Sequence, residues 1–422
     1  MSIAFRADAA FARQMDEGDP LAKYRERFHI PKGPDGADCV YLCGHSLGLQ
    51  PKTVRSYVGQ ELDDWAKLGV EAHFRGTHPW MSYHRLLTEQ TARLVGAKPV
   101  EVVVMNSLTV NLHLMMVSFY RPTKERHKIV VEESAFPSDQ YAVKSQIRYH
   151  GLDSAKSLVE LKPRAGERVL RDEDIVALIE REGDSIALVM LGGVNYSSGQ
   201  FFDLEAIARA GHAKGCAVGF DLAHAAGNLP LKLHDWSADF AVWCSYKYLN
   251  GGPGCIAGCF VHERHTREAL PRFAGWWGHD QETRFQMGPE FQAAPGAEGW
   301  QVSNPPILTM AALRASMDIF DEVGMQRLRE KSVALSGYLE FLLDQRRSEK
   351  FWIITPPEAG RRGAQLSICV PRNGREVCDR LTEAGVLCDW REPDILRVAP
   401  APLYNTFADV HAFAEKFATL VG

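Results

Sequence analysis

The stretch Asp239–Gly254, DFAVWCSYKYLNGGPG, joins an apolar run to a glycine-rich turn. The run FAVW predicts a strand that is buried on both faces, as in a parallel sheet covered by helices. Lys247 follows this strand and lies between two tyrosines. A lysine at this place is either an ordinary surface residue at a strand end or a buried amine that can react with a carbonyl group.

Apolar runs on both sides of this stretch extend the same pattern. Strand-like runs rich in valine, isoleucine and alanine alternate with helical periodicity from about residue 100 to residue 262, which predicts a mainly parallel α/β sheet. Asp203 is a suitable cap for one of the intervening helices. A long helical region is expected over Thr309–Gln345, and a small α+β unit is expected over residues 350–422.

Composition excludes several classes of protein. The 422 residues carry a net charge of −5, which gives no reason to expect a nucleic-acid partner. The first residues lack the long apolar core of a signal peptide, and no apolar run approaches the roughly 18 residues of a membrane span. The nine cysteines are scattered, and their C-x3-C pairs differ from common zinc and redox spacings. We therefore expect a cytoplasmic protein with reduced cysteines and no membrane partner.

Two short motifs suggest chemistries that the sequence does not support. Gly44–Gly48, GHSLG, matches the G-x-S-x-G elbow of serine hydrolases, but that elbow needs a helix directly after the serine. Here the next helix begins only after Pro51, so a glycine-rich loop that holds a substrate is the better interpretation. The spacing of His73, His78 and His84 matches no metal-binding pattern, and we expect no metal.

Asp221 and Lys247 follow two strands that we expect to be neighbours in the sheet. Ligands of parallel sheets bind outside the carboxyl ends of the strands, so both side chains should face one crevice. Pyridoxal 5'-phosphate (PLP) requires such a pair, because a carboxylate keeps its pyridine nitrogen protonated and a lysine forms a Schiff base with its aldehyde. The pair alone is not specific, since any α/β protein supplies an aspartate and a lysine.

Four further residues at the ends of the predicted strands favour the PLP interpretation. Thr109 opens a helix whose backbone N–H groups can bind phosphate, and Phe136 can lie flat on a pyridine ring. Asp139 can hydrogen-bond a ring substituent, and His224 reaches the same crevice. Each also has an ordinary structural interpretation as a cap or a core residue. Their order along successive strands is what indicates a single cofactor site.

Several stretches closely resemble the kynureninase family of fold-type I PLP enzymes: SLTVNLH, AFPSDQYA, GFDLAHAAGN, WCSYKYLNGGPG, SNPPI and RVAPAPLYN. The match covers nearly the whole chain. It implies a large domain with a mainly parallel, seven-stranded-type sheet sandwiched by helices, and a small α+β C-terminal domain. The expected parts are an N-terminal segment that contributes to the active site and the small domain (1–50), a large PLP-binding domain (51–310), and a connecting long helix with the small domain (311–422).

The resemblance also implies roles for individual residues. Lys247 would hold PLP as a Schiff base, Asp221 would pair with its pyridine nitrogen, and Phe136 would stack on its ring. The residues expected to bind the phosphate or complete the cofactor shell are Leu108, Thr109, Pro137, Ser138, Asp139, His224, Tyr246, Trp276 and Asn304. Trp276 and Asn304 would come from the other subunit of a homodimer. Gly192 lies where some relatives carry a serine, which leaves that cofactor contact open.

Substrate contacts follow from the same resemblance. Arg397 would bind the α-carboxylate, a task that suits a planar, bidentate cation. The residues expected to face the aromatic end of the substrate are Ser46, His73 and Asn304. Since the last two could hydrogen-bond an extra phenol hydroxyl, they favour 3-hydroxy-L-kynurenine over L-kynurenine.

The family hydrolyses the Cβ–Cγ bond of kynurenine in tryptophan catabolism and NAD biosynthesis, releasing L-alanine and anthranilate or 3-hydroxyanthranilate. Lys247 would be the general base at Cα, and Tyr246 would either carry protons or only bind phosphate. Two alternatives stay open. A cysteine desulfurase-like enzyme would need a mobile cysteine at the cofactor, and the sequence alone does not place Cys369 or Cys388. The other alternative is a PLP-binding protein without catalysis.

Overall fold

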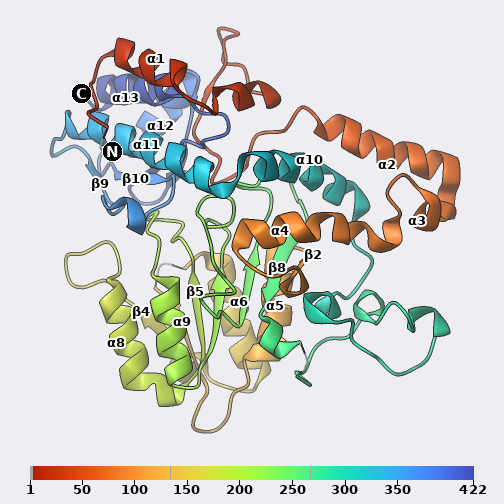
Figure 1. Cartoon of the computed structure of the whole chain (residues 1–422). Helices are drawn as coiled ribbons and strands as arrows, with labels where there is room; N and C mark the ends of the chain where they lie inside the picture. Colours follow the sequence, from red (N-terminus) through yellow and green to blue (C-terminus); the bar gives the residue numbers. More distant parts are fainter. Residues whose placement is uncertain (1–2, 134, 267) are drawn as a thin grey trace.

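The computed structural model describes residues 3–133, 135–266 and 268–422. The central part of the chain forms the large α/β domain in the lower half of Figure 1. The C-terminal residues gather with helix α1 (Ala9–Glu17) in the upper part, where both chain ends lie close together.

The large domain is built on a seven-stranded sheet with the order β2-β8-β7-β6-β5-β3-β4. Five neighbouring strands, from β4 to β7, pair in parallel, whereas β8 is antiparallel to both of its neighbours. The strands are β2 (Val102–Met105), β3 (Lys128–Glu132), β4 (Leu158–Leu161), β5 (Ile186–Gly192), β6 (Ala217–Asp221), β7 (Phe240–Trp243) and β8 (Ala257–Val261). The mainly parallel seven-stranded sheet that the sequence predicts is confirmed.

Helices cover both faces of this sheet because every central strand is apolar on both sides. In β2, Val102 and Val104 join one core cluster and Val103 and Met105 join another. The second cluster contains α5 and α6, and the first contains α4, α8, α9 and α10. These helices are α4 (Thr88–Val95), α5 (Leu108–Phe119), α6 (Pro137–Tyr149), α8 (Asp172–Glu182), α9 (Leu204–Ala213) and α10 (Ile307–Val323).

Other helices complete this domain. Helix α2 lies at the right of Figure 1, beside α3. Asp203 caps α9 as expected, since its side chain accepts a hydrogen bond from the Ala206 N–H at 2.9 Å. The remaining helices of this part are α2 (Val54–Leu68), α3 (Ala72–Arg75) and α7 (Ser154–Ser157).

A smaller sheet with the order β12-β13-β10-β9 forms the second core, together with helices from both ends of the chain. Residues 40–41 pair in parallel with residues 386–387, so the N-terminal segment packs with the C-terminal residues. The elements are β1 (Val40–Tyr41), β9 (Trp352–Ile353), β10 (Leu366–Cys369), β11 (Val386–Leu387), β12 (Asp389–Arg391), β13 (Ile395–Val398), α11 (Met325–Asp344), α12 (Gly374–Glu383) and α13 (Phe407–Val421).

The long helical region expected over Thr309–Gln345 is wrong in one respect, because it is two helices. Helix α10 ends at Val323 and α11 begins at Met325. Gly324 between them has a φ of +80°, a conformation that glycine adopts without steric cost and that ends an α-helix. The sequence signal for the break is this single glycine inside an otherwise continuous helical pattern.

Two expectations from composition can be compared with the structure. Among the described residues, no helix is long and apolar enough to cross a membrane. All nine cysteines have free thiols, and seven of them are buried. Burial raises the pKa of several of these thiols, including that of Cys259. These cysteines therefore behave as small apolar residues of the two cores.

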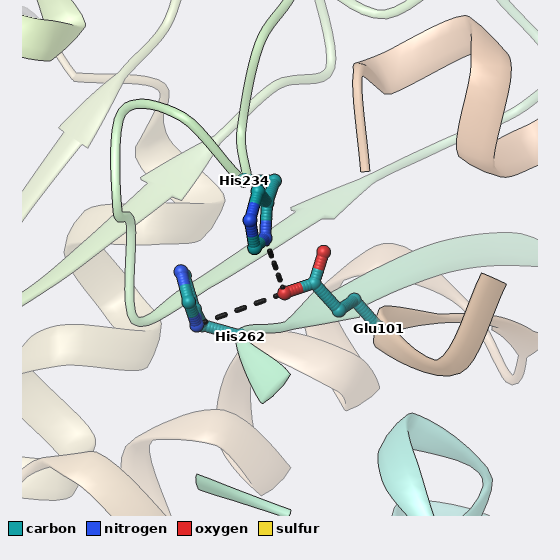
Figure 2. A group of neighbouring side chains, drawn as sticks. All are labelled: Glu101, His234 and His262. Carbon is teal, nitrogen blue, oxygen red and sulfur yellow. Dashed lines mark hydrogen bonds and ion pairs between the residues drawn. The ribbon is translucent and has the colours of Figure 1, made fainter. Parts of the chain in front are cut away.

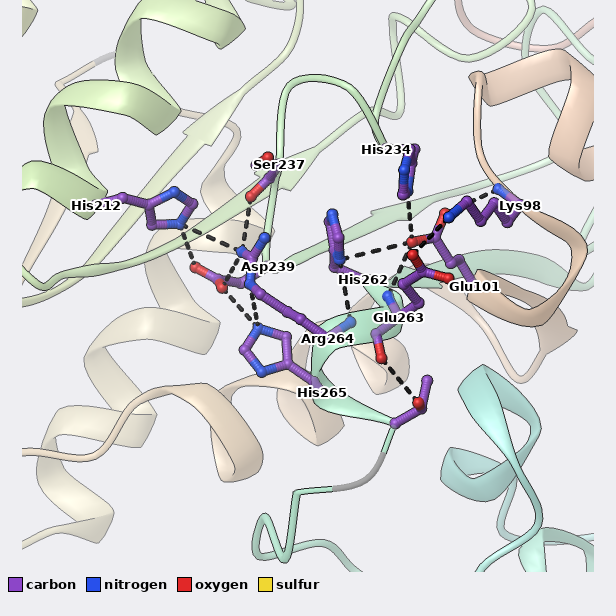
Figure 3. Close-up of polar contacts among 11 residues, drawn as sticks. Lys98, Glu101, His212, His234, Ser237, Asp239, His262, Glu263, Arg264 and His265 are labelled. Carbon is purple, nitrogen blue, oxygen red and sulfur yellow. Dashed lines mark hydrogen bonds and ion pairs between the residues drawn. The ribbon is translucent and has the colours of Figure 1, made fainter.

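A buried carboxylate anchors the amino end of β7, the strand that leads to Lys247. Asp239 precedes β7 and is 5% exposed. It accepts hydrogen bonds from the rings of His212 at 2.9 Å and His265 at 2.7 Å, and it pairs with Arg264 (Figure 3). Burial opposes ionisation, but these donors outweigh it and hold the pKa of Asp239 well below its usual range.

Replacing Asp239 by asparagine should therefore destabilise the fold. Removing one partner of a buried charge network costs about 3–5 kcal/mol, and we expect the free energy of unfolding in urea at pH 7 to fall by about that amount. A carboxylate whose pKa is lowered by folding contributes its stability at neutral pH and loses it as the pH falls below about 4, so the difference should shrink in acid. Asp235→Asn, at a nearby exposed position, is the control; equal losses in both variants would contradict this account.

A neighbouring cluster at the same end of the sheet resembles a metal site but has other partners. The potential ligand atoms of Glu101, His234 and His262 lie within 4.8 Å of one another (Figure 2). The Glu101 carboxylate already accepts the backbone N–H groups of Glu263 and of residue 98, each at 2.8 Å, and the His234 ring nitrogen at 2.9 Å. His262 Nδ1 accepts the N–H of residue 264 at 3.2 Å. These contacts explain the cluster as part of the structural network in Figure 3.

Candidate active site

The carboxyl ends of β6 and β7 open into one cavity. The two strands pair in parallel, with Asp221 opposite Val242, and Lys247 follows the end of β7 at Trp243. The cavity has a volume of about 160 Å³. Its walls are formed by Leu108, Thr109, Glu132, Phe136, Ser138, Asp139, Gly192, Val194, Tyr196, Asp221, Ala223, His224, Tyr246 and Lys247.

Lys247 lies against a buried histidine and two aromatic rings. Its Nζ is 3.1 Å from His224 Nε2, 5.7 Å from the centroid of the Phe136 ring and 5.9 Å from that of the Tyr246 ring. Burial and the charge of Lys247 lower the pKa of His224 well below its usual range, so its imidazole is neutral at physiological pH. A neutral Nε2 accepts a hydrogen bond from the lysine, and this contact fixes the position of the amine in the cavity.

Two acids face the lysine from different elements. Asp221 ends β6 and accepts the Ala223 N–H at 2.7 Å, and Asp139 lies in the first turn of α6. Burial raises the pKa of both groups, and their mutual repulsion raises that of Asp139 further. Asp139 Oδ1 has no hydrogen-bond partner within the described residues. A positively charged ring in the cavity would reverse this effect and favour ionised carboxylates.

Two hydroxyl groups lie together at one side of the cavity, where two helices begin. Thr109 and Ser138 lie in the first turns of α5 and α6, and their oxygens are 2.9 Å apart. The first N–H groups of a helix have no partner inside the helix and attract anions. Pro137 is the first residue of α6, where its missing N–H costs no hydrogen bond. It sets the start of this helix and is not part of the cavity wall.

Glu132 and Tyr196 also line the cavity, and sequence reasoning missed both. Glu132 ends β3 at the same edge of the sheet as Asp221. The sequence signal that could have identified it is a charged residue at the end of an apolar strand. Its carboxylate accepts the Gly192 N–H at 3.3 Å, and burial raises the pKa of Glu132 to about 7. A Cβ atom on Gly192 would lie 2.8 Å from Glu132 Oε1, so the carboxylate occupies the space that a side chain at position 192 would need.

Arg397 reaches the site from β13 of the smaller sheet. It is 1% exposed, its Nε donates to Asp389 Oδ1 at 2.6 Å, and its Nη2 pairs with Oδ2 of the same carboxylate. Its Nη1 donates to the Tyr196 backbone oxygen at 2.8 Å, and its guanidinium lies 5.8 Å from the centroid of the Tyr196 ring. Because Tyr196 lines the cavity, Arg397 lies just behind the cavity wall.

Besides Pro137 and Arg397, four predicted residues do not line the cavity of a single chain: Ser46, His73, Trp276 and Asn304. Ser46 and His73 are half-buried, and His73 packs edge-on against Trp80. Trp276 and Asn304 are exposed, although Trp276 is large and aromatic. These four residues therefore lie outside the part of the site that a single chain forms.

The groups in the cavity fit PLP. They comprise an amine that can take the aldehyde, carboxylates for the pyridine nitrogen, hydroxyls at two helix starts for the phosphate, and an aromatic ring beside the amine. The buried atoms Asp139 Oδ1 and His224 Nδ1 have no partner among the described residues and are available to a ligand. The fold and this set of groups define the chain as a fold-type I PLP-dependent enzyme.

Comparisons with known proteins identify the family. A family model described as "Kynureninase C-terminal domain" matches residues 328–417. The chain is 71% identical to kynureninase of Koribacter versatilis, covering 99% of this chain and 98% of that protein. It is 62% identical to kynureninase of Myxococcus xanthus, covering 97% of each, and 51% identical to that of Christiangramia forsetii, covering 98% of each. The chain belongs to the kynureninase family, as the sequence motifs predict.

Solved structures with the same fold include cysteine desulfurases. That of Thermococcus onnurineus NA1 superposes with a TM-score of 0.75 at 19% identity, covering 93% of this chain and 98% of that chain. CsdA of Escherichia coli superposes with a TM-score of 0.76 at 18% identity, covering 95% and 98%. At these identities the likeness concerns the fold alone, whereas the much closer relatives are kynureninases.

A cysteine desulfurase-like enzyme would need a cysteine at the cofactor, and the cavity does not supply one from the described residues. Among the described residues, no cysteine lines the cavity. Cys369 is fully buried in β10, with its Sγ 3.2 Å from an Asp394 oxygen, and Cys388 lies beside Cys378 with 4.0 Å between their sulfur atoms. Neither residue is placed to reach a cofactor held by Lys247.

Proposed function

We propose that this cavity binds PLP through Lys247 and hydrolyses L-kynurenine, or its 3-hydroxy derivative, to L-alanine and the corresponding anthranilate. The observation that carries the proposal is the amine of Lys247, placed 3.1 Å from neutral His224 and in one cavity with Asp221, in a chain of the kynureninase family. When bound, PLP withdraws electrons from the substrate carbons next to the amino group. The protein then has to position the substrate and move protons.

Lys247 is suited to move the proton at Cα. Its amine is held by His224 Nε2, which accepts a hydrogen bond but carries no positive charge. Because this imidazole is neutral, it orients the amine through a hydrogen bond without acting as its counter-ion. The amine of Lys247, held in this way, acts as general base at Cα, a role worth about 10²–10⁴ in rate.

Tyr246 is suited to donate a proton. Burial raises the pKa of its phenol above the usual range, so the hydroxyl stays protonated at neutral pH. It lines the cavity next to Lys247 and is half-buried. We propose that Tyr246 donates the proton that Cβ must receive after the Cβ–Cγ bond breaks. Whether or not it donates this proton, Tyr246 would also bind the phosphate.

Arg397 is suited to bind the substrate α-carboxylate. A guanidinium has five N–H donors; Asp389 takes two of them and the Tyr196 backbone oxygen takes one. Two donors are left on the terminal nitrogens, the arrangement that binds a carboxylate in a bidentate way. The Arg397 guanidinium also lies 5.8 Å from the centroid of the Tyr196 ring, a cation–π contact that adds to its hold in this position.

The substrate preference that we propose is for 3-hydroxy-L-kynurenine. His73 and Asn304 each offer hydrogen-bonding groups, and a site built to bond a hydroxyl discriminates strongly against a substrate that lacks it. We expect kcat/KM for 3-hydroxy-L-kynurenine to exceed that for L-kynurenine by about ten-fold or more. His73→Ala should reduce this ratio. A higher kcat/KM for L-kynurenine in the unchanged protein would refute the preference.

We also propose a homodimer in which each site is completed by Trp276 and Asn304 of the second subunit. An exposed apolar surface supports this, since Trp276 is 43%, Phe285 56% and Met287 75% exposed. Two-fold dimers are the commonest protein assemblies.

Mixed dimers test the shared site. Lys247→Ala and Asn304→Ala should each give nearly inactive homodimers, because each removes a group from every site. Co-expression in equal amounts makes half of the dimers mixed, and each mixed dimer has one unaltered site, so about a quarter of the normal activity should return. An activity no higher than the mean of the two single variants would show that the site is not shared.

We propose a cytoplasmic location on the basis of the cysteines. All nine are free, which agrees with a reducing compartment. Detection of the native protein in a periplasmic or secreted fraction of its source cells would contradict this location.

A further inference from the structure

His45 is a fully buried histidine beside the proposed carboxylate site. It belongs to the GHSLG loop and has 0% exposure. The loop is held closely on both sides, since a Cβ on Gly44 would lie 2.4 Å from the Tyr404 hydroxyl oxygen and one on Gly48 would lie 2.4 Å from the Lys247 backbone oxygen. His45 is therefore fixed between the lysine segment and the smaller domain.

The ring of His45 contacts groups from both domains. Its Nε2 is 3.4 Å from Asp389 Oδ2, and its centroid is 6.3 Å from that of His224. Burial and the charge of Arg397 lower the pKa of His45 to about 4, so the ring is neutral at physiological pH. The Asp389 contact is longer and less well aligned than an ordinary hydrogen bond, and neither ring nitrogen has another hydrogen-bond partner among the described residues.

Substrate binding changes the balance of charge at this place. In the structure Asp389 takes two donors of Arg397, and it also contacts Arg391 at 3.1 Å. When the α-carboxylate binds, two carboxylates share the Arg397 guanidinium. Asp389 keeps its two hydrogen bonds to Arg397, but the guanidinium charge is now shared with a second carboxylate, and an additional donor to Asp389 would offset the weaker attraction. The nearby N–H of a neutral His45 is such a donor. Because the ring is neutral, it supports Asp389 without forming an ion pair that would compete with the pairing of Asp389 and Arg397.

We propose that His45 is a positioning residue for the substrate α-carboxylate: its Nε2–H stabilises Asp389 while Arg397 binds the second carboxylate. The inference rests on the proposed role of Arg397. His45 touches neither the reacting carbons nor Lys247 in this scheme. Its loss should therefore weaken binding of ligands with an α-carboxylate and leave the chemical step nearly unchanged.

The two reaction products separate these effects. L-alanine carries the α-carboxylate and anthranilate is the aryl product, so their dissociation constants from the holoenzyme can be measured by calorimetry. We expect His45→Ala to weaken L-alanine binding about ten-fold, since a hydrogen bond to a charged group is lost, and to leave anthranilate binding unchanged. His45→Gln keeps an N–H donor and should restore L-alanine affinity to within about three-fold. In turnover, KM for L-kynurenine should rise while kcat stays within about two-fold.

His84 supplies a matched control. It is 1% exposed and its Nε2 is 3.3 Å from a Glu298 carboxylate oxygen, yet it has no link to Arg397. His84→Ala should leave both product affinities unchanged. His45→Leu, which fills the space without ring nitrogens, replaces His45→Ala if the latter does not fold. Normal L-alanine binding by the His45 variant, or an equal loss of anthranilate binding, would overturn the proposal.

Arg397→Ala separates a wrong role for Arg397 from a wrong role for His45. If it leaves L-alanine affinity unchanged, the proposed role of Arg397 is wrong and the inference about His45 falls with it. If it weakens L-alanine binding while His45→Ala does not, only the inference about His45 is wrong.

Discussion

Replacing Lys247 by alanine is expected to reduce turnover of L-kynurenine by about 10⁴-fold or more and to remove the absorption band of the lysine-bound cofactor. Among the described residues of the cavity wall, Lys247 alone has an amine that can form a Schiff base, and this amine is also the proposed base at Cα. Both roles are lost together, so the effect should be at least as large as that of removing a general base. Absorbance spectra and turnover of the purified variant are the measurements.

A lysine elsewhere in the chain provides the control for this experiment. Lys156 is exposed on α7 and lies outside the cavity. Lys156→Ala should keep both the absorption band and the activity. Turnover of Lys247→Ala at the normal rate would contradict the assignment of the cofactor site.

Replacing Asp221 by asparagine is expected to lower kcat/KM by about 10²–10³-fold, because it leaves a buried positive charge on the pyridine ring without its partner, at a cost of about 3–5 kcal/mol. Asp221 is 7% exposed, and burial raises its pKa in the free protein. A protonated pyridine ring beside it would stabilise the ionised form. Asparagine has nearly the same size but cannot balance that charge, so the loss should come without a loss of folding.

Cofactor retention separates this effect from unfolding. Asp221→Asn should release PLP more readily during dialysis while its thermal unfolding without PLP stays close to that of the unchanged protein. Asp235→Asn, at an exposed position, should behave normally in both tests. Full activity and normal PLP retention in Asp221→Asn would show that this carboxylate does not serve the cofactor.

The sequence predicts the large sheet well because its signals are local. The apolar runs around Asp221 and Lys247 define β6 and β7, and the rule that ligands bind at the carboxyl ends of parallel strands brings the two residues together. The break at Gly324 was missed because tertiary packing decides whether one glycine bends a helix or ends it.

The site residues that escaped prediction depend on contacts over long stretches of chain. Glu132 accepts a hydrogen bond from the Gly192 N–H, sixty residues away, and its position after an apolar strand does not indicate that partner. The contact of His45 with Asp389 joins two ends of the chain through the pairing of β1 with β11. Sequence patterns record periodicity and spacing, and they carry no direct information on such pairings.

The central claim is that the Lys247 cavity performs hydrolytic cleavage of kynurenine, and the products of a single incubation test it most directly. Purified protein with PLP is mixed with L-kynurenine, and the aromatic and amino-acid products are separated and quantified. We predict anthranilate and L-alanine in equal amounts, in proportion to the kynurenine consumed. Recovery of all the kynurenine unchanged, or its conversion to products other than this pair, would contradict the account.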